Sequence, residues 1–257
     1  MPFATAPVAR IRKSIRGAAG IARSLRIYYG NPARRRRMTV LYSRFVKPGD
    51  LVFDIGAHVG DRVAAFRSLG ARVVAIEPQP AAHRWLRLRY GRDRMVSLVQ
   101  AAIGDEPGEA TFHVNLANPT VSTASKDFIA AARGASGWEG QHWDETIRVP
   151  LVTLDMLIEQ HGAPAFAKID VEGFELNVLM GLSEPVPALS FEFTTIQRDV
   201  AVACIDRLAQ LGPYKFNAAI GESQQLLFQK DVSAATMRTH LRTLPHETNS
   251  GDIYAKL

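Results

Sequence analysis

A glycine-rich turn follows the first strongly apolar run of the main body and offers the groups that a small ligand needs. The turn, Asp54-Ile-Gly56-Ala-His58-Val-Gly60, lies between a run typical of a buried strand and a helical pattern. Gly56 permits a tight turn, and Gly60 lets the backbone approach a ligand at the start of the helix. Asp54 stands at the strand end, where its carboxylate can accept a hydrogen bond from an ammonium group. The turn therefore predicts a site for a ligand that carries an amino acid.

A second acid, Glu77, ends the next apolar run 23 residues after Asp54. A nucleotide-binding βαβ unit holds at this place the acid that accepts the hydroxyls of a ribose. The glycine spacing G-x-x-x-G lacks the third glycine of the dinucleotide fingerprint, and Asp61 stands in its place. Because Asp61 would repel a pyrophosphate, the pair favours S-adenosylmethionine over NAD. The alternative without a ligand is that Asp54 caps the helix and Glu77 forms a surface ion pair.

Charged residues alternate along another apolar run and predict a second polar cluster. Lys168, Asp170 and Glu172 point to one side of their strand if the strand stays extended through Glu172. On the next strand, one face carries Leu189, Phe191 and Phe193, and the other carries Ser190 and Glu192. The carboxyl ends of strands form the ligand crevice of open α/β sheets, so this cluster is the candidate catalytic centre. The alternative is an internal ion-pair network that fixes the strand ends.

Asp170 is the predicted general base of this cluster. A hydroxyl is a poor nucleophile until its proton is removed, which calls for a base or a metal ion within hydrogen-bond reach. We expect repulsion from Glu172 and Glu192 to raise the pKa of Asp170, with Lys168 opposing that shift. Three carboxylates are also ligands that Mg²⁺ or Mn²⁺ accepts, so a divalent metal is a variant of this prediction.

From residue 51 onward, short apolar runs alternate with helix-length amphipathic segments, which is the pattern of βαβ units and a mostly parallel sheet. The pattern predicts an α/β fold of about seven strands with an antiparallel C-terminal hairpin, in which 214–219 pairs with 224–229. The expected strands are 51–55, 72–76, 96–100, 110–114, 148–153, 166–171, 188–193, 214–219, 224–229 and 253–256, and the expected helices are 59–69, 81–90, 155–161, 175–182 and 200–211.

One segment, residues 115–147, has no clean period and is rich in Ser, Thr, Asn and Gly. Loops of this length inside a compact domain are functional or disordered. The segment contains Trp138 and Trp143, and tryptophan is costly to leave in a mobile loop. We therefore expect an ordered lid or a substrate wall here rather than a solvent loop.

Six short segments together resemble the FkbM family of methyltransferases. Lys168-Ile-Asp-Val-Glu-Gly173 is the most specific, and the others are Val46-Lys-Pro-Gly-Asp50, Asp54-Ile-Gly-Ala57, Ala75-Ile-Glu-Pro78, Ala101-Ala-Ile-Gly-Asp105 and Val152-Thr-Leu-Asp155. The resemblance covers roughly residues 45–193, with a weaker match towards the C-terminus, and leaves out the N-terminal arm. It implies a class I methyltransferase (Rossmann-like) fold, S-adenosylmethionine as the donor and O-methylation as the usual activity.

The resemblance also implies which residues hold the cofactor. The glycine turn and Glu77 would bind its methionine and ribose parts, and the stretch from Ala102 to Asp105 would flank its adenine. His58 stands where the family more often has Asn, and both side chains can donate a hydrogen bond. The cofactor-binding residues expected on this basis are Asp54, Gly56, His58, Gly60, Glu77, Ala102 and Asp105.

Positive charge is concentrated at the N-terminus. Residues 1–49 carry twelve of the 31 Lys and Arg and no acid, which leaves 19 against 25 acids in the rest of the chain. The mildly acidic body excludes a broad nucleic-acid-binding face. Apolar residues recur at steps of three and four from Val8 to Tyr29, which predicts an amphipathic helix that ends at Asn31-Pro32. This arm either contacts anionic lipid head groups peripherally or packs on the domain with a solvated basic face.

We expect a basic helical extension, residues 1–45, and a methyltransferase domain, residues 46–257. Removal of the arm should leave fold and cofactor affinity intact, because the glycine turn and the sheet follow Leu51. The arm lacks the apolar core of a signal peptide, and no later stretch reaches the roughly 18 apolar residues of a membrane span. The single cysteine, Cys204, excludes an intramolecular disulfide. These features predict a cytoplasmic protein with a possible contact at the inner face of the membrane.

Methylation with S-adenosylmethionine is the predicted function, at a hydroxyl on a sugar, a glycolipid precursor or a secondary metabolite. Trp138 and Trp143 could stack on an apolar sugar face, and residues 118–125 could supply hydrogen bonds. An NAD-dependent oxidoreductase is the alternative enzyme, motivated by the shared turn and by Glu77. A non-enzymatic adaptor that binds a ligand and acts through its basic arm is the third hypothesis.

Overall fold

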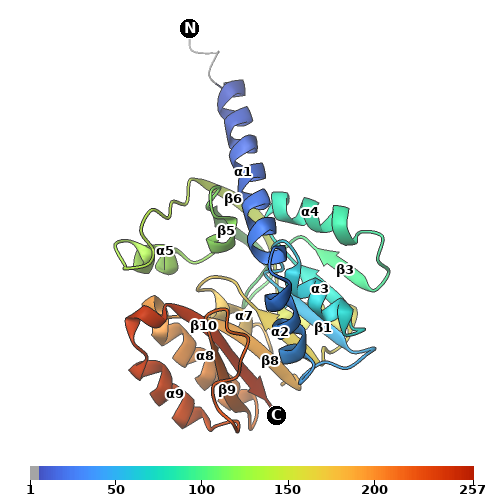
Figure 1. Ribbon diagram of the computed structural model, residues 1–257, viewed down its shortest axis with the longest axis vertical. Coiled ribbons are helices and arrows are strands. Elements are labelled where there is room, and N and C mark those ends of the chain that lie inside the picture. The colour runs from blue at the N-terminus through green and yellow to red at the C-terminus, as the bar shows by residue number, and fades with distance from the viewer. Residues whose placement is uncertain (1–5) are drawn as a thin grey trace.

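Seven strands form the central sheet in the order β3-β2-β1-β7-β8-β10-β9 (Figure 1). The computed structural model describes residues 6–257, with side chains described from residue 16 onward. Neighbouring strands are parallel except β10, which is antiparallel to both β8 and β9. This topology confirms the predicted α/β fold with about seven mostly parallel strands. The strands are β1 (Leu51–Ile55), β2 (Arg72–Ile76), β3 (Val96–Val99), β7 (Phe166–Ile169), β8 (Ala188–Thr194), β9 (Lys215–Ile220) and β10 (Ser250–Lys256).

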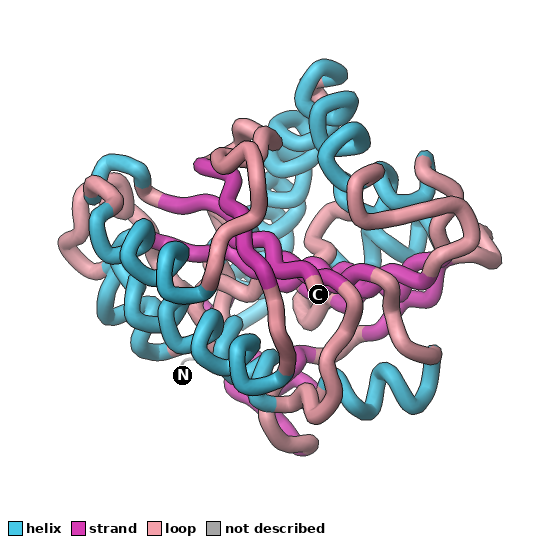
Figure 2. Tube along the Cα trace, turned by 90° about the horizontal axis from the view of Figure 1, so that it is seen from below, coloured by secondary structure: helices cyan, strands magenta, loops and turns pink. Residues whose placement is uncertain are grey.

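Helices cover both faces of the sheet, so the molecule has three layers (Figure 2). The central strands are buried on both faces, which explains why they read as continuous apolar runs rather than as an alternation. The predicted helices are confirmed, each to within two residues at its ends. One layer contains α2 (Pro32–Tyr42), α3 (Asp61–Ser68) and α4 (Pro80–Tyr90), and the other contains α6 (Leu154–His161), α7 (Glu175–Met180), α8 (Arg198–Leu211) and α9 (Ala234–Thr243).

A second, three-stranded sheet of β4 (Ala102–Ile103), β6 (Glu145–Val152) and β5 (Gly108–Val114) stands beside the main one. The chain between β5 and β6 contains η1 (Pro119–Val121) and α5 (Lys126–Ala132) and closes over its own small core. Trp138 packs edge-on against Phe128 at 5.1 Å between ring centroids, and the Trp143 indole donates to the Val121 carbonyl at 2.8 Å. The expectation of an ordered segment here is confirmed.

The predicted strand at 224–229 is wrong. The partner of β9 is β10, and 224–229 is an irregular loop. The Asn217 side chain explains the loop, because it accepts from the Phe228 amide and donates to the Phe228 carbonyl. A single backbone bond, from the Leu227 amide to the Ala218 carbonyl at 2.7 Å, also joins the loop to β9, so no continuous ladder forms here. The chain then forms α9, which the sequence patterns did not indicate, and returns as β10.

Two helices precede the sheet. The predicted arm helix is α1 (Ala6–Tyr29), and Asn31 caps α2 by accepting from the Arg34 amide at 3.0 Å. The side chains of Val8, Ile11 and Ile15 lie outside the described residues. The division at residue 45 stays a prediction, but α2 buries Met38, Leu41 and Tyr42 in the core of the domain. Within residues 6–257, no helix is long and apolar enough to cross a membrane.

Candidate active site

A pocket of about 820 Å³, including its opening to solvent, lies at the carboxyl ends of β1, β2, β7 and β8. This is the ligand crevice of an open α/β sheet. Seven of the eleven residues predicted from the sequence line it, and four do not. Those that line it are Gly56, His58, Glu77, Ala102, Asp170, Glu172 and Glu192; those that do not are Asp54, Gly60, Asp105 and Lys168.

The glycine turn forms one wall of the pocket. Gly56 has a φ of 82°, and a Cβ there would lie 1.8 Å from the Asp170 carbonyl oxygen, so only glycine fits beside the end of β7. Gly60 has a φ of 79° and packs against α4, where a Cβ would approach Leu86 and Tyr90 within 3 Å. Gly60 therefore serves close helix packing, and the predicted direct approach to a ligand belongs to Gly56.

Asp54 lies behind this wall, fully buried, and neither of its carboxylate oxygens has a hydrogen-bond partner among the described residues. The alternative that Asp54 caps the following helix is wrong, because the N-cap of α3 is Gly60 and has no side-chain bond. Burial raises the pKa of Asp54 to about 7. A buried carboxylate without donors is unfavourable by roughly 1–3 kcal/mol or more. Asp54 is therefore suited to a cationic donor supplied by a ligand.

Glu77 is 2% exposed and is held by the backbone. Its two oxygens accept from the amides of His58 at 2.9 Å and Gln79 at 2.8 Å. Burial raises the pKa of Glu77 to about 7, against the lowering effect of those two bonds. The alternative of a surface ion pair is wrong, since the residue is buried. Each oxygen keeps a further lone pair, so the carboxylate can accept two hydroxyls.

The part of the pocket expected to hold the adenine is mainly apolar. Ala102 lines the pocket together with Ile103 and Phe112, which gives an apolar wall. Asp105 is exposed in the turn after β4 and does not reach the pocket, so its predicted cofactor contact is not supported by the geometry. The His58 ring lines the pocket, and burial lowers its pKa to about 4, which keeps it neutral.

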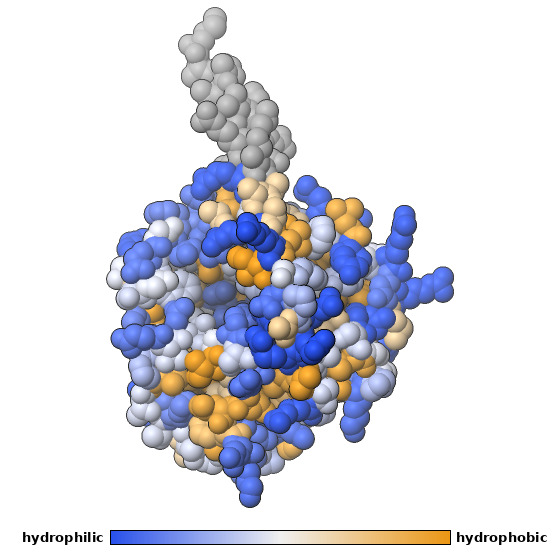
Figure 3. Space-filling model, viewed as in Figure 1, coloured by the Kyte–Doolittle hydropathy of each residue, from blue (hydrophilic) through white to orange (hydrophobic). Residues whose placement is uncertain are grey.

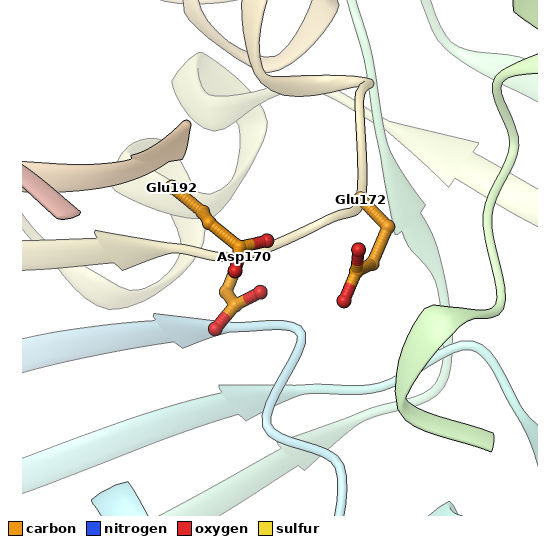
Figure 4. Close-up of side chains that lie close together, drawn as sticks. All are labelled: Asp170, Glu172 and Glu192. Carbon is orange, nitrogen blue, oxygen red and sulfur yellow. The ribbon is translucent and has the colours of Figure 1, made fainter. Parts of the chain in front are cut away.

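Three carboxylates face one space at the ends of β7 and β8 (Figure 4). Asp170, Glu172 and Glu192 each place an oxygen within 4.8 Å of the other two. The prediction that the strand stays extended through Glu172 is wrong. β7 ends at Ile169, and Glu172 has a left-handed backbone with φ of 55°. The turn, not an extended strand, brings Glu172 back towards Asp170.

Lys168 does not reach the pocket. Its side chain is fully buried, and Nζ lies 2.9 Å from Asp252 Oδ1 and 3.4 Å from Asp170 Oδ2. Nζ also donates to the Ile169 carbonyl at 3.0 Å. Lys168 therefore balances the charge of two carboxylates and is a positioning residue, not the catalytic residue predicted from the sequence.

Arg62 is a pocket residue that the sequence patterns missed. One of its guanidinium nitrogens lies 3.1 Å from Asp170 Oδ2, and another lies 3.9 Å from Asp61. Arg62 stands in the first turn of α3, where the helix dipole disfavours a cation. An arginine in the first turn of a helix therefore indicates a carboxylate partner outside that helix. The position of Arg62 after the glycine turn could have indicated such a partner from the sequence alone.

The charges around Asp170 reverse the expected pKa pattern. Burial raises the pKa of Asp170, but Lys168 and Arg62 outweigh it, so the pKa lies below its ordinary value. Burial and the neighbouring carboxylates raise the pKa of both Glu172 and Glu192 well above the ordinary range. The expectation of a raised pKa at Asp170 is therefore wrong, and the proton-accepting groups of the cluster are the two glutamates.

The N-terminal helices also belong to the site. Tyr28 lines the pocket, with its ring edge-on to His58 at 6.0 Å. Arg34 lies over the Tyr28 ring and pairs with Asp61 at 2.7 Å and Glu222 at 2.8 Å. Because α1 ends in the pocket wall, the geometry argues against the expectation that the arm can be removed without loss of cofactor affinity, which stays a prediction.

A sequence model of the methyltransferase FkbM domain matches residues 54–226. The chain belongs to the FkbM methyltransferase family. One relative is the 31-O-demethyl-FK506 methyltransferase FkbM of Streptomyces tacrolimicus, which is 30% identical over 161 residues, or 54% of this chain and 62% of the relative. The chain thus matches less than two thirds of that relative's length.

Solved structures of other methyltransferases are similar at low identity. They include precorrin-6y C5,15-methyltransferase from Geobacter metallireducens GS-15 (14% identical, TM-score 0.44, covering 86% of each chain). An O-methyltransferase from Bacillus cereus in complex with SAH is 11% identical with a TM-score of 0.42, covering 93% of this chain and 90% of that one. With TM-scores below 0.5, these likenesses carry no weight for function beyond the family match.

Replacement of Gly56 by alanine should destabilise the protein more than the same change at Gly49. Both glycines have a positive φ, but a Cβ at position 49 meets nothing within 4 Å, whereas one at position 56 meets the Asp170 carbonyl. We expect Gly49→Ala to cost about 1–2 kcal/mol from backbone strain alone and Gly56→Ala about 1–3 kcal/mol more. Chemical denaturation measures both values, and equal losses would contradict the proposed close approach.

Removal of the end of α1 should weaken cofactor binding. Deletion of residues 1–31 takes away Tyr28 from the pocket wall, and we expect adenosylhomocysteine affinity to fall by about ten-fold or more, as burial of one aromatic side chain implies. Deletion of residues 1–15 is the matched control and should leave the affinity unchanged. Titration calorimetry compares the three proteins, and equal affinities would return the arm to the status of a separate extension.

Proposed function

We propose that the protein transfers a methyl group from S-adenosylmethionine to a hydroxyl of a small acceptor, of the class of sugars, glycolipid precursors or secondary metabolites. The observation that carries the donor assignment is Asp54, a fully buried carboxylate without partners beside a pocket that also holds Glu77. A buried anion of this kind fits the ammonium of an amino-acid-bearing cofactor. FkbM family membership supports methyl transfer as the reaction.

The pocket offers a partner for each part of this cofactor. Glu77 would accept from the two ribose hydroxyls, and Asp54, which lies behind the pocket wall, would attract the ammonium electrostatically. The apolar wall at Ala102, Ile103 and Phe112 would face its adenine. When bound, the cofactor supplies a methyl group on a positively charged sulfur. The carboxylates in the pocket wall outnumber the cations there, which suits a donor with net positive charge: Asp61, Glu77, Asp170, Glu172, Glu192 and Glu222 against Arg62.

We assign the general base to Glu172, in place of Asp170. Asp170 stays ionised because Lys168 and Arg62 hold its charge, and this makes it a weak proton acceptor. After Lys168 and Arg62, Glu192 also lowers the pKa of Asp170, so we assign Glu192 as the protonated partner of Asp170. Glu172 is left as the pocket carboxylate whose raised pKa suits proton abstraction from a hydroxyl.

A divalent metal at the three carboxylates is the competing arrangement. Oxygen ligands of this type suit Mg²⁺ or Mn²⁺. Two cations, Lys168 and Arg62, already neutralise Asp170, which weakens its ability to ligate a further cation. Loss of activity in EDTA that Mg²⁺ restores would favour the metal over the base.

An oxidoreductase and a ligand-binding adaptor are less well supported. The pocket contains Asp61 at the start of α3, where a dinucleotide would place its pyrophosphate, and the matched family consists of methyltransferases. The adaptor hypothesis predicts that the pocket residues are dispensable, whereas the variants below should remove turnover.

Cofactor affinity should increase as the pH rises through about 7. Asp54 and Glu77 both have a pKa raised to about 7, so at lower pH they are protonated, lose their negative charge and hold an ammonium or a hydroxyl more weakly. We expect adenosylhomocysteine to bind roughly ten-fold more weakly at pH 6 than at pH 8. Calorimetry with Asp54→Asn should show weak binding at both values, and NAD should not bind. Tight NAD binding without any response to adenosylhomocysteine would reverse the assignment.

Glu172→Gln should lower turnover by roughly a hundred-fold while cofactor affinity is retained, because the change removes the base but keeps its shape. In the unaltered protein, turnover should rise with pH through the raised pKa of Glu172, and the variant should lose this rise. Glu184→Gln, in the exposed loop before β8, is the matched control. A normal pH profile in Glu172→Gln, with turnover lost in Asp170→Asn, would return the base to Asp170.

A further inference from the structure

Over residues 18–24, the helix α1 meets the body through small residues and not through its apolar stripe. Gly20 and Ser24 are buried one turn apart, and a Cβ on Gly20 would lie 2.5 Å from the Leu116 carbonyl oxygen. Ala18 and Ala22, which belong to the apolar stripe of the sequence, are exposed. The stripe is therefore not consumed by packing on the domain over this part of the helix.

In the sequence, the same stripe continues through Val8, Ile11 and Ile15 towards the N-terminus, and basic residues fill the gaps between them. Figure 1 shows that this part of α1 extends beyond the rest of the chain. At about 1.5 Å per residue, a 24-residue helix is roughly 36 Å long. A basic amphipathic helix of this kind, with one end anchored in a domain, is suited to an interface between water and an apolar phase.

A second basic element lies beside it. The helix α4 shares an open groove with α1, lined by Ala18 and Ile21 on one side and by Arg84, Trp85 and Leu88 on the other. Leu88 is 78% exposed and lines this groove. Figure 3 shows hydrophobic and strongly hydrophilic residues side by side over α4 and where α1 meets the body.

Neither α1 nor α4 contains an acid, and one acid, Glu145, lines the groove between them. The helix α4 contains three arginines and no acid, and the exposed Arg84 and Arg87 flank Leu88 without an ion-pair partner among the described side chains. Arg26 of α1 is also exposed. We call this surface, made of Ala18, Ala22, Arg26, Arg84, Arg87 and Leu88, the α1–α4 face.

We propose that the α1–α4 face docks on the surface of an anionic lipid bilayer. Its arginines would meet lipid phosphates, and Leu88 together with the apolar stripe of α1 would enter the boundary between head groups and acyl chains. An exposed leucine among arginines favours a lipid surface over a nucleic acid, because a nucleic acid backbone offers no apolar layer for the leucine. The proposal is independent of the methyl donor and acceptor.

The test is co-sedimentation of the full chain with vesicles. We expect binding to vesicles of equal parts phosphatidylglycerol and phosphatidylcholine, little binding to phosphatidylcholine alone, and release at 0.5 M salt, because salt of that order screens exposed charges within a few ångströms. Equal binding to both vesicles would overturn the electrostatic contact. Binding to soluble heparin without binding to anionic vesicles would overturn the lipid as the partner.

Variants on the face separate its two components. Arg84→Ala and Arg87→Ala should each weaken binding about five-fold, which corresponds to about 1 kcal/mol per charge. Leu88→Ser should weaken it by roughly ten-fold through lost apolar burial. The matched controls, Arg242→Ala on α9 and Met156→Ser on α6, change exposed residues on the other face of the sheet and should bind as the unaltered chain does. If Leu88→Ser and the arginine variants also bind unchanged, the face is not the docking surface.

Discussion

A chain of alternating charges runs through the centre of the molecule, and the arrangement of the pocket depends on it. It includes the fully buried Lys168, whose ammonium would destabilise the fold by several kcal/mol if left unpaired. Each link lies within 4 Å of the next, and the chain joins the antiparallel strand β10, the end of β7, the first turn of α3, the start of α2 and the loop after β9. In order, it consists of Asp252, Lys168, Asp170, Arg62, Asp61, Arg34 and Glu222.

This series of ion pairs gives the acids of the pocket different pKa values. A carboxylate that neutralises two cations is a weak base, so Asp170 is held in place and kept ionised. Glu172, which has no cation of its own among the described residues, carries the raised pKa. The same logic ties α2 to the site, because Arg34 closes the chain between Asp61 and Glu222. A boundary drawn from composition at residue 45 cuts through these contacts.

The parts of this design that are local in sequence could be predicted, and the parts that depend on distant pairing could not. The apolar runs of β1 and β2 and the motif residues Asp54 and Glu77 are each defined by their neighbours in the chain. The pairing of Lys168 with Asp252 joins residues 84 positions apart, and no periodicity reports it. Likewise, 224–229 has the composition of a strand, but whether it joins the sheet depends on competition with β10. That competition is decided by burial, since β10 is covered on both faces.

Positive charges lie on the exposed surface of α1 and α4, and negative charges lie in the pocket. This arrangement allows the proposed lipid docking and the proposed methyl transfer to coexist. The exposed surface of α1 and α4 is basic, whereas the pocket wall and the residues behind it are mainly acidic. Exposed charges are screened over about 8–10 Å at physiological salt, but buried pairs are screened much less. An anionic surface drawn to the arginines therefore does not compete with a cationic donor drawn to the pocket. Because α1 carries both the basic surface and Tyr28 of the pocket wall, a docked helix would also fix the pocket relative to the bilayer.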